Sequence, residues 1–510
     1  MFRSILFGDT PPPPDLDSRP EPAFFHDLNL DQGTAWVTAG LGDYRLEPFF
    51  YTPLAGPGEI SYRHEVFRDL AGDALLQRVK AFAAAMRRVR EELAAAQKLH
   101  YPRQRRRWFL ESAATYCDAV TALAADLRDA AITSRGFLGV REYLAGYVAS
   151  DGFATLAAET TSLRADLAGV SYSMLIKGNR VRVRKYEGED DYSREVLAVF
   201  EKFRQGTVQD YRVRYPAAGE MNHVEAGVLD LVAKLYPDEF AALDRYCQRH
   251  AGYLDDTITR FDREIQFYLA YLAHIRPLQA AGLHFCFPRV SARSKQIRAE
   301  ATFDLALALK LVRDGAPVVT NDFHLDGGER VLVVTGPNQG GKTTLARTFG
   351  QLHHLARLGC PVPGRDAALY LCDEVFTHFE KEEDLATLSG KLHDDLARFR
   401  DILDRATASS VIIMNEIFTS TTLDDALFLG REMLEKIVGI GSLCVCVTFL
   451  DELASLDPAC VSMVATVAPD NPAVRTYRVI RKPADGLAYA AALAAKYGLG
   501  YDQLKGRLAS

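Results

Sequence analysis

Residues Val331–Thr344 read VLVVTGPNQGGKTT, and this stretch decides the fold of the C-terminal part of the chain. Val331–Val334 are apolar residues of high strand propensity and predict a buried strand. Gly336–Thr343 then match the spacing G-x-x-x-x-G-K-[ST] of a phosphate-binding loop, the P-loop or Walker A motif. The residues from Leu345 to Leu358 follow with helical spacing. Strand, loop and helix therefore occur in the order that such a loop requires.

The residue types in this loop suit the phosphates of a nucleotide. Glycines let backbone N–H groups close around phosphate oxygens, and the N-terminus of the following helix adds partial positive charge. The Lys342 amine can reach the outer phosphates, and the Thr343 hydroxyl can ligate Mg²⁺. A glycine-rich turn without a ligand is the alternative, but strand, spacing, lysine and threonine all favour a binding loop. The predicted nucleotide-binding residues are Gly336, Pro337, Asn338, Gln339, Gly340, Gly341, Lys342, Thr343 and Thr344.

Length and composition set the outer limits of the interpretation. The 510 residues suffice for about three domains, and 48% hydrophobic residues are an ordinary globular value. The net charge of −7 excludes a strongly basic nucleic-acid binder, so any DNA contact has to come from local patches. The 8 cysteines form no CxxC pair, and no run of about 18 apolar residues occurs. These features predict a cytoplasmic protein with reduced thiols and no membrane span.

The pattern along the chain divides it into three predicted regions. Residues 1–60 are rich in proline and aromatic residues, and residues 61–277 have the spacing of long helices. Within the second region, Asp255–Arg276 is a strong helical run that we expect Pro277 to end. Residues 278–510 predict an α/β domain with a mostly parallel sheet, because helices alternate with apolar strands near Val331, Leu369, Val411, Leu443 and Arg475.

A short β-hairpin is predicted near residues 174–186, inside the helical region. A Gly-Asn turn separates two strands, and Arg180, Arg182 and Arg184 alternate along the second. Alternation places all three arginines on one face, where they could contact a nucleic-acid backbone. The open alternative is a solvated face whose field is partly cancelled by the acidic residues that follow, Glu187 and Glu189 among them.

A hydrolytic site also needs a carboxylate to activate water and a second group to help hold the metal. The apolar run Val411–Met414 predicts a buried strand, and Asn415 and Glu416 fall at its C-terminal end. In an open parallel sheet this end faces the ligand crevice. Glu416 is therefore the candidate general base, and Thr343 and Asn415 are the candidate Mg²⁺ partners. The alternative is a strand that simply ends in a solvated polar pair.

Asn415 is unusual, because ATPases of this class usually have aspartate at this position. Asparagine keeps the oxygen and its hydrogen-bonding ability but loses the negative charge. Two unit charges about 4 Å apart interact by about 4 kcal/mol at an effective dielectric of about 20, so the loss matters for metal binding. We therefore expect weaker metal binding and slow turnover, unless Thr343, phosphate and water suffice as ligands.

Several stretches resemble the MutS family of DNA mismatch-repair ATPases. GPNQGGKTT is similar to the GPNMGGKST-type loop of that family, and the residues from Leu355 to Pro363 resemble the segment that follows the loop. The resemblance is strongest over about 300–510 and continues weakly into the helical part, where Asp255–Arg276 resembles the long lever helix. The other matching stretches are Asp373–His378, Ser389–Lys391, Asn415–Asp425 (NEIFTSTTLDD), Thr448–Leu453 and Gly486–Leu499.

The resemblance implies a multidomain protein with an α-helical core and lever region and an ABC-type P-loop ATPase domain. ATP and Mg²⁺ are the implied cofactors, and a homodimer acting on DNA is the implied assembly. Ser389 and Gly390 would belong to the signature segment that reaches the partner's nucleotide. Asp425 would lie in a loop that couples the nucleotide state to the partner. The adenine would pack near Val318–Asn321.

The chain also departs from the family pattern. We expect the N-terminal mismatch-reading domain to be missing and the DNA clamp to be reduced to the predicted hairpin or absent. Asn415 replaces aspartate, Phe449 replaces a histidine on the nucleotide side, and Phe418 and Thr419 replace glycine and arginine. These departures put mismatch recognition in question but leave the prediction of nucleotide binding intact.

Three functional hypotheses follow. The first is a MutS-like, DNA-associated ATPase whose homodimer is gated by ATP, acting in mismatch repair or in related processing of DNA structures. The second is a structural clamp that binds the nucleotide and hardly hydrolyses it, which Asn415 and Phe449 favour. The third is an ATPase that acts on branched DNA or on a protein partner and not on mispairs.

Overall fold

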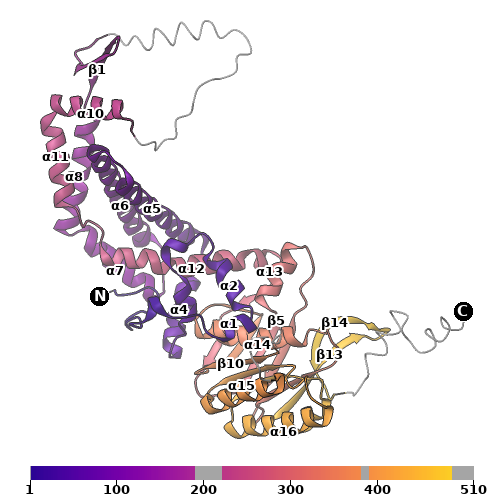
Figure 1. The fold of residues 1–510 in the computed structure, drawn as a ribbon. Coiled ribbons are helices and arrows are strands. Elements are labelled where there is room, and N and C mark those ends of the chain that lie inside the picture. Colours follow the sequence, from indigo (N-terminus) through magenta and orange to yellow (C-terminus); the bar gives the residue numbers. More distant parts are fainter. Residues whose placement is uncertain (1, 190–220, 381–389, 485–510) are drawn as a thin grey trace, which may run out of the picture. The chain divides into compact units, whose positions relative to one another are not determined.

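The computed structural model describes residues 2–189, 221–380 and 390–484 (Figure 1). These residues form two compact units. The helical unit contains the described residues of Gly72–Ile132 and Phe137–Asp262, together with Phe2. The α/β unit contains Arg3–Ala71, Thr133–Gly136 and the described residues from Arg263 onward. The chain is thus multidomain, with a helical region followed by a mixed α/β region.

Long alanine-rich helices build the helical unit. Alanine favours helices and allows close approach, and α5 and α6 lie side by side within this unit (Figure 1). Leu75, Val79, Phe82 and Met86 recur at helical spacing along the buried face of α5. The helices are α5 (Asp73–Lys98), α6 (Pro102–Asp129), α7 (Arg135–Val148), α8 (Asp151–Ala168), α10 (His223–Leu235) and α11 (Pro237–Arg249).

Helix α12 (Asp256–Ala280) is longer than the sequence predicts. We expected Pro277 to end this helix, but Pro277 lies inside it, and the Ala281 N–H donates to the Pro277 carbonyl at 3.1 Å. A proline this close to a C-terminus removes only one helical hydrogen bond, so the last turn persists. None of the described helices is both long and apolar enough to cross a membrane.

The hairpin of the helical unit consists of β1 (Tyr172–Lys177) and β2 (Arg180–Lys185), paired antiparallel. Lys177 pairs with Arg180, so Gly178 and Asn179 form the connecting turn. Gly178 has a φ of +59°, a conformation that suits glycine and that tight hairpin turns require. A hairpin therefore lies where the Gly-Asn pair predicts one.

The main sheet of the α/β unit has the strand order β10-β11-β12-β7-β13-β14. Strands β10, β11, β12, β7 and β13 run parallel to one another, whereas β14 pairs antiparallel with β13. The central strands β7, β11 and β12 are buried along their whole length, as expected for a parallel sheet covered on both faces. Their bounds are β7 (Val331–Thr335), β10 (Val375–Phe379), β11 (Val411–Asn415), β12 (Leu443–Val447), β13 (Cys460–Ala468) and β14 (Asn471–Arg481).

Two of the strands expected in one mostly parallel sheet differ from that expectation: one lies in another sheet, and one belongs to the main sheet but runs antiparallel. Leu369 belongs to β9, in a separate sheet of order β4-β9-β5-β6 that mixes parallel and antiparallel pairs. Arg475 belongs to the antiparallel edge strand β14. The remaining pair is β3 (Phe285–Cys286) with β8 (Val362–Pro363), and the second sheet contains β4 (Arg289–Ser291), β5 (Ile297–Thr302), β6 (Asn321–Leu325) and β9 (Asp366–Tyr370).

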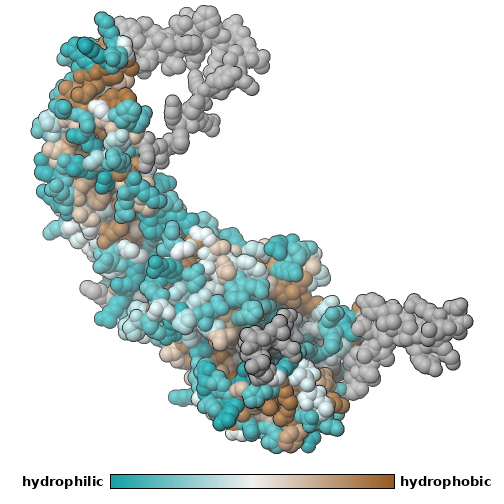
Figure 2. All heavy atoms as spheres, in the orientation of Figure 1, coloured by the Kyte–Doolittle hydropathy of each residue, from teal (hydrophilic) through white to brown (hydrophobic). Residues whose placement is uncertain are grey.

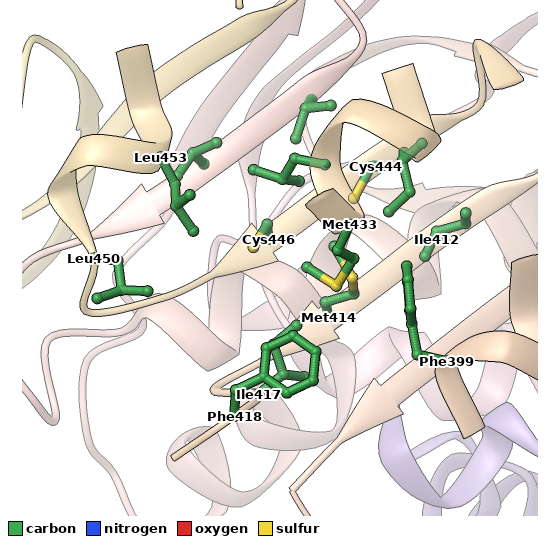
Figure 3. Packing of buried hydrophobic residues seen from close by; sticks show 14 of the residues in the cluster. Phe399, Ile412, Met414, Ile417, Phe418, Met433, Cys444, Cys446, Leu450 and Leu453 are labelled. Atoms are coloured by element: carbon green, nitrogen blue, oxygen red, sulfur yellow. The ribbon is translucent and has the colours of Figure 1, made fainter. Parts of the chain in front are cut away.

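Helices α15 (Lys391–Arg405) and α16 (Leu423–Ile440) cover one face of the main sheet. Side chains on this face form one buried cluster, which joins Ile412 and Met414 of β11 with Phe399 and Met433 of the two helices (Figure 3). Because side chains alternate along a strand, Ile413 points to the other face. There it meets α14 (Lys342–Arg357), where a Cβ at Gly350 would lie 2.5 Å from Ile413 Cδ1.

The N-terminal segment, Arg3–Ala71, packs on α14. Polar side chains of this helix bind backbone carbonyls of the segment: Arg347 Nε donates to Asp27 O at 2.9 Å, and Gln351 Nε2 donates to Leu28 O at 2.8 Å. The ring of His354 bonds the Phe50 carbonyl at 3.0 Å. The elements of this region are α1 (Phe24–Asp27), α2 (Leu30–Thr38), α3 (Glu47–Tyr51) and α4 (Pro57–Leu70), and α13 (Leu305–Arg313) also lies in the unit.

Candidate functional site

The candidate site begins where β7 ends at Thr335. The loop turns through positive φ at Gly336 (+109°), Gln339 (+60°) and Gly341 (+96°). A Cβ at Gly336 would lie 2.8 Å from the Ala465 carbonyl oxygen, so only glycine fits there. Helix α14 starts directly after Gly341, and the N–H groups of its first turn have no partner within the helix. The strand–loop–helix predicted from the sequence is therefore present.

Lys342 lies folded into its own loop and is only 4% exposed. Its Nζ donates to the Gly336 carbonyl at 2.9 Å, the Pro337 carbonyl at 3.4 Å and Asn338 Oδ1 at 3.2 Å. Burial lowers the pKa of the Lys342 amine, and the nearby carboxylate of Glu416 opposes this shift. A buried ammonium that is held only by neutral oxygens and one carboxylate gains from an anion placed in the loop.

The end of β11 meets the start of α14 at the same edge of the sheet. The Thr343 hydroxyl donates to Asn415 Oδ1 at 2.8 Å, and Lys342 Nζ lies 3.8 Å from Glu416 Oε1. Asn415 is buried, whereas the Glu416 side chain is 35% exposed. The structure thus brings together the four residues proposed for phosphate, metal and base roles, although β12 lies between β7 and β11 in the sheet.

The backbone around Glu416 is strained. Glu416 has a φ of +52° and Phe418 a φ of +59°, in a region that non-glycine residues rarely occupy. The Glu416 N–H is fixed by the Val447 carbonyl at 2.9 Å, which anchors the turn to β12. Such strain costs about 1–3 kcal/mol per residue and is typical of functional sites. It projects the Glu416 side chain from the strand end towards the loop lysine.

The remaining loop residues line the same turn. Pro337 and Gly340 are buried, with Gly340 N donating to the Pro337 carbonyl at 3.1 Å, whereas Asn338 and Gln339 are exposed. The Thr344 carbonyl accepts from the Thr348 hydroxyl at 2.8 Å within α14. Exposed residues at the tip of the loop leave its mouth accessible.

The predicted signature segment is only partly described. Ser389 lies outside the described residues, and Gly390 is the exposed N-cap of α15. The next residue, Lys391, forms an ion pair with Glu380, which also accepts a 2.9 Å hydrogen bond from the Thr419 hydroxyl. Glu380 therefore ties the start of α15 to the turn after β11.

Asp425, predicted to couple two subunits, stabilises the start of α16 in the structure. Its carboxylate accepts from the Thr422 hydroxyl at 2.9 Å and the Thr421 hydroxyl at 3.3 Å. Its N–H donates to the Thr422 Oγ1 at 3.3 Å, so Thr422 is the N-cap of the helix. These contacts are local to the turn after β11. Phe449, the residue that replaces the family's histidine, is 49% exposed in the segment after β12.

The three hairpin arginines are all exposed on one face of β2, as their alternation predicts. Arg184 pairs with Glu189 at 2.7 Å, which partly cancels the basic face. The opposite face carries exposed Met174 and Ile176. Figure 2 shows hydrophobic and hydrophilic residues close together at this end of the helical unit, near the strand labelled β1 in Figure 1. The arginines belong to a different unit from the loop site.

One neighbour of the loop was not expected from the sequence. Strand β14 runs past the turn: Arg475 Nε donates to the Asn338 carbonyl at 3.1 Å, and a Cβ on Gly341 would lie 3.3 Å from the Tyr477 carbonyl oxygen. Asn321, at the end of the predicted adenine segment, donates to the Tyr477 carbonyl at 3.1 Å and accepts from Val479 N at 2.7 Å. In the sequence, Arg475 only marked a strand, and no local pattern pointed to the loop.

Fold and site together define an α/β domain with a glycine-rich strand–loop–helix at the carboxyl edge of a mainly parallel sheet. Residues 332–498 match the family model of MutS domain V. This match begins inside β7 and includes the loop, the end of β11 and strand β14. This part of the chain is therefore similar to domain V of MutS proteins.

Individual relatives agree with the family match. The chain is 30% identical over 194 residues to the DNA mismatch repair protein MutS of Chlorobium phaeovibrioides, which covers 37% of this chain and 22% of that protein. It is 31% identical over 187 residues to the protein of the same name from Chlorobium limicola, covering 36% and 22%. It is 30% identical over 157 residues to the protein of that name from Bacillus pumilus, and this match covers 29% of this chain and 18% of that protein. The match thus spans about a fifth of the length of each relative.

Proposed function

We propose that the loop Gly336–Thr343 binds the phosphates of ATP and that the α/β unit is a P-loop ATPase domain of the ABC type. The observation that carries this proposal is the buried Lys342, whose amine lies inside a glycine turn at the start of a helix. Backbone N–H groups, a helix N-terminus and one lysine converge on a space suited to phosphate oxygens. The match to MutS domain V supports the same assignment.

The residues at the strand edge fit a magnesium ion. A threonine hydroxyl and an amide oxygen meet 2.8 Å apart, and Glu416 follows in the chain, so oxygen ligands of the kind that Mg²⁺ prefers are present. Thr343 and Asn415 would hold the ion, which would help neutralise phosphate charge when bound. Glu416 would accept a proton from the attacking water, because its carboxylate is partly exposed beside the loop lysine.

The similarity to named relatives also supports a proposal for the role of this domain in the cell. The relatives are named DNA mismatch repair proteins, and we infer that this chain acts in mismatch repair or in related processing of DNA structures. An ATP-gated homodimer would place Ser389 and Gly390 of one subunit at the nucleotide of the other. DNA would contact the exposed face of Arg180, Arg182 and Arg184.

A second function is favoured by one specific observation. Asn415 presents a neutral oxygen to Thr343, so this position lacks a carboxylate that would strengthen metal binding. A clamp that closes on the nucleotide and hydrolyses it slowly agrees with this arrangement. An ATPase that acts on branched DNA or a protein partner shares the same site and differs only in its target.

Turnover measurements test the ATPase proposal. We expect the wild type to hydrolyse ATP in the presence of Mg²⁺ and the Lys342→Ala variant to lose this activity. Wild-type turnover that survives in the variant would assign hydrolysis to another site or to a contaminant. Absence of turnover together with retained nucleotide binding would favour the clamp.

A salt-controlled DNA-binding panel tests the target. Mismatched, branched and plain duplexes are compared with and without ATP, each over a series of salt concentrations. Preference for a mismatched or a branched duplex would identify the DNA structure on which the protein acts. Equal binding to all three, unaffected by ATP, would favour a protein partner.

A further inference from the structure

Strand β14 places a second positively charged side chain on the phosphate loop. Arg475 Nε donates to the Asn338 carbonyl at 3.1 Å, while Lys342 Nζ donates to the side-chain oxygen of the same residue at 3.2 Å. Both cations therefore contact Asn338, one from the helix and one from the edge strand. Arg475 is partly buried and belongs to the same α/β unit as the loop.

The segment that carries Arg475 is held firmly in place. The hydroxyls of Thr466 and Thr476 lie 2.6 Å apart, and Thr476 Oγ1 also donates to the Thr466 carbonyl at 2.9 Å, which joins β13 to β14. Asn321 binds the backbone of β14 through Tyr477 O and Val479 N. These hydrogen bonds flank a register irregularity between Ala465 and Val467, so the strand approaches the loop in one defined position.

Strand β13, the partner of β14, also lies close to the loop. A Cβ at Gly340 would lie 3.0 Å from the Ala465 Cβ, and the corresponding contact at Gly336 is 2.8 Å from the Ala465 carbonyl. The hairpin of β13 and β14 thus forms one wall of the loop. A charged side chain on this wall can therefore contact a ligand bound in the loop.

Two neighbouring cations repel each other when no anion lies between them. Burial is the main cause of the lowered pKa of Lys342, and the charge of Arg475 lowers it further. An anion bound in the loop would relieve this repulsion and gain from both charges. Asn415 contributes no negative charge at the same edge, so the described site favours polyanions more strongly than a site with aspartate at that position.

We propose that Arg475 is a second phosphate-binding cation of the loop, and that Lys342 and Arg475 together make nucleotide binding largely independent of Mg²⁺. This inference rests on the proposed nucleotide-binding function. Arginine suits the role because its guanidinium can keep the Nε contact to Asn338 while its other N–H groups face phosphate oxygens. Hydrolysis would still need the metal, whereas binding would not.

The experiment titrates a fluorescent ATP analogue into the full chain, with Mg²⁺ or with excess EDTA. We expect the dissociation constant of the wild type to differ by less than about threefold between the two conditions, because the two cations would take over the role of the metal in binding. In EDTA, the affinity of the Arg475→Met variant for the analogue should be at least about tenfold lower than that of the wild type, because a charge-assisted hydrogen bond is lost. The matched control is Arg478→Met, an exposed arginine of the same strand, and it should behave as wild type.

A ligand series separates phosphate binding from a merely structural role of Arg475. If Arg475 binds phosphate, the loss in the variant should be largest for ATP, smaller for ADP and AMP, and absent for adenosine. An equal loss for all four ligands, or a lowered melting temperature of the free variant, would show that Arg475 only fastens the loop. Wild-type binding that requires Mg²⁺, or an Arg475→Met variant equal to wild type, would also overturn the inference.

The Lys342→Met variant distinguishes failure of this inference from failure of the proposed function. Undiminished nucleotide affinity in Lys342→Met, or no binding by the wild type in either condition, would remove the proposed nucleotide site itself, and the role of Arg475 with it. Binding that is lost in Lys342→Met but unchanged in Arg475→Met would keep the nucleotide site and reject the second cation.

Discussion

The hydroxyl of Thr343 donates a 2.8 Å hydrogen bond to the side-chain oxygen of Asn415. The two residues lie 72 positions apart in sequence, one in the first turn of α14 and the other at the last position of β11. Their contact shows that the loop and the strand end form one site. Both oxygens belong to uncharged groups, which distinguishes this contact from one that a carboxylate would make with Thr343.

Replacing Asn415 by aspartate should strengthen Mg²⁺ binding at the site. A carboxylate beside Thr343 would attract Mg²⁺ by several kcal/mol at an effective dielectric of about 20, so hydrolysis should become faster and should saturate at lower Mg²⁺. Turnover against Mg²⁺ concentration measures this effect. Asn179→Asp adds the same charge in the hairpin turn and should leave turnover unchanged. An unaltered profile in Asn415→Asp would mean that other groups already hold the metal.

Replacing Glu416 by glutamine separates the enzyme from the clamp. If Glu416 is the general base, turnover should fall by about 10²–10⁴-fold. ATP affinity should stay within a few-fold of wild type, because the amide still fills the space beside Lys342. Single-turnover hydrolysis and equilibrium binding are measured on the same preparation. Turnover equal to wild type would support a clamp in which Glu416 takes no part in chemistry.

Replacing Gly336 by alanine should disrupt the loop. The added Cβ would lie 2.8 Å from the Ala465 carbonyl oxygen, and the residue would keep a φ of +109° that L-residues rarely adopt. We expect a loss of stability of about 1–3 kcal/mol and of nucleotide affinity. Gly328→Ala is the matched control, since a Cβ there meets nothing within 4 Å. Chemical denaturation would contradict this expectation if both variants were equally stable.

Acid should destabilise the α/β unit through the buried histidines of α14. Burial lowers the pKa of His353 to about 4 and that of His354 to about 3, from 6.5 for an exposed ring. Above pH 6.5 the two rings are neutral in the folded and in the unfolded chain, so the full stability is present. As the pH falls from 6.5 towards 4, the unfolded chain gains protons that the folded chain rejects. Each ring then lowers the free energy of unfolding by at most about 1.4 kcal/mol per pH unit.

Thermal melts at pH 7 and pH 5 test this sign. His353→Leu should reduce the loss of melting temperature between the two pH values, because one buried titrating ring is gone. His26→Leu, at a side chain that is 86% exposed, should leave the pH dependence as in wild type. A steeper loss in His353→Leu would contradict the assignment.

The hairpin arginines should contribute to DNA affinity if DNA is the target. Arg180→Glu with Arg182→Glu should weaken binding without sequence preference and should reduce the slope of log affinity against log salt by about 2, one for each lost contact. Arg128→Glu, at an exposed position at the end of α6, is the control for a charge reversal outside the hairpin, and it is compared with Arg180→Glu alone, which has the same charge change. Unchanged affinity and slope would show that the basic face of β2 is only solvated.

The sequence was sufficient for the parts of the site that have a local signature. The loop glycines, Lys342 and Thr343 follow a fixed spacing, and the apolar run before Asn415 and Glu416 predicts a strand end. Parallel packing then brings the two ends to one edge, which the Thr343–Asn415 contact shows. Alternation likewise placed Arg180, Arg182 and Arg184 on one face.

The wall formed by β14 could not be predicted in this way. Arg475 lies in an alternating strand whose antiparallel pairing and register irregularity depend on β13 and on the side chain of Asn321. These are long-range contacts, and neither the spacing nor the composition near Arg475 encodes them. A polar residue in an edge strand reads as solvated unless its partner is known.

The packing of the N-terminal segment on α14 could not be predicted from the sequence for a related reason. Arg347, Gln351 and His354 are polar residues that recur along one side of that helix, and the sequence alone names no partner for them. In the structure they bind the backbone carbonyls of Asp27, Leu28 and Phe50, so polar side chains satisfy polar backbone within the fold. Pattern analysis assumes that polar residues face water, and it fails where a separate segment supplies the hydrogen-bond partners.

Calorimetric titration with ATP tests the central claim most directly. The claim is that a triphosphate occupies the turn around the Lys342 amine. We expect saturable binding of about one ATP per chain to the wild type and no detectable binding to the Lys342→Ala variant, whose melting temperature serves as the control for folding. Equal affinity in the two proteins would contradict the claim.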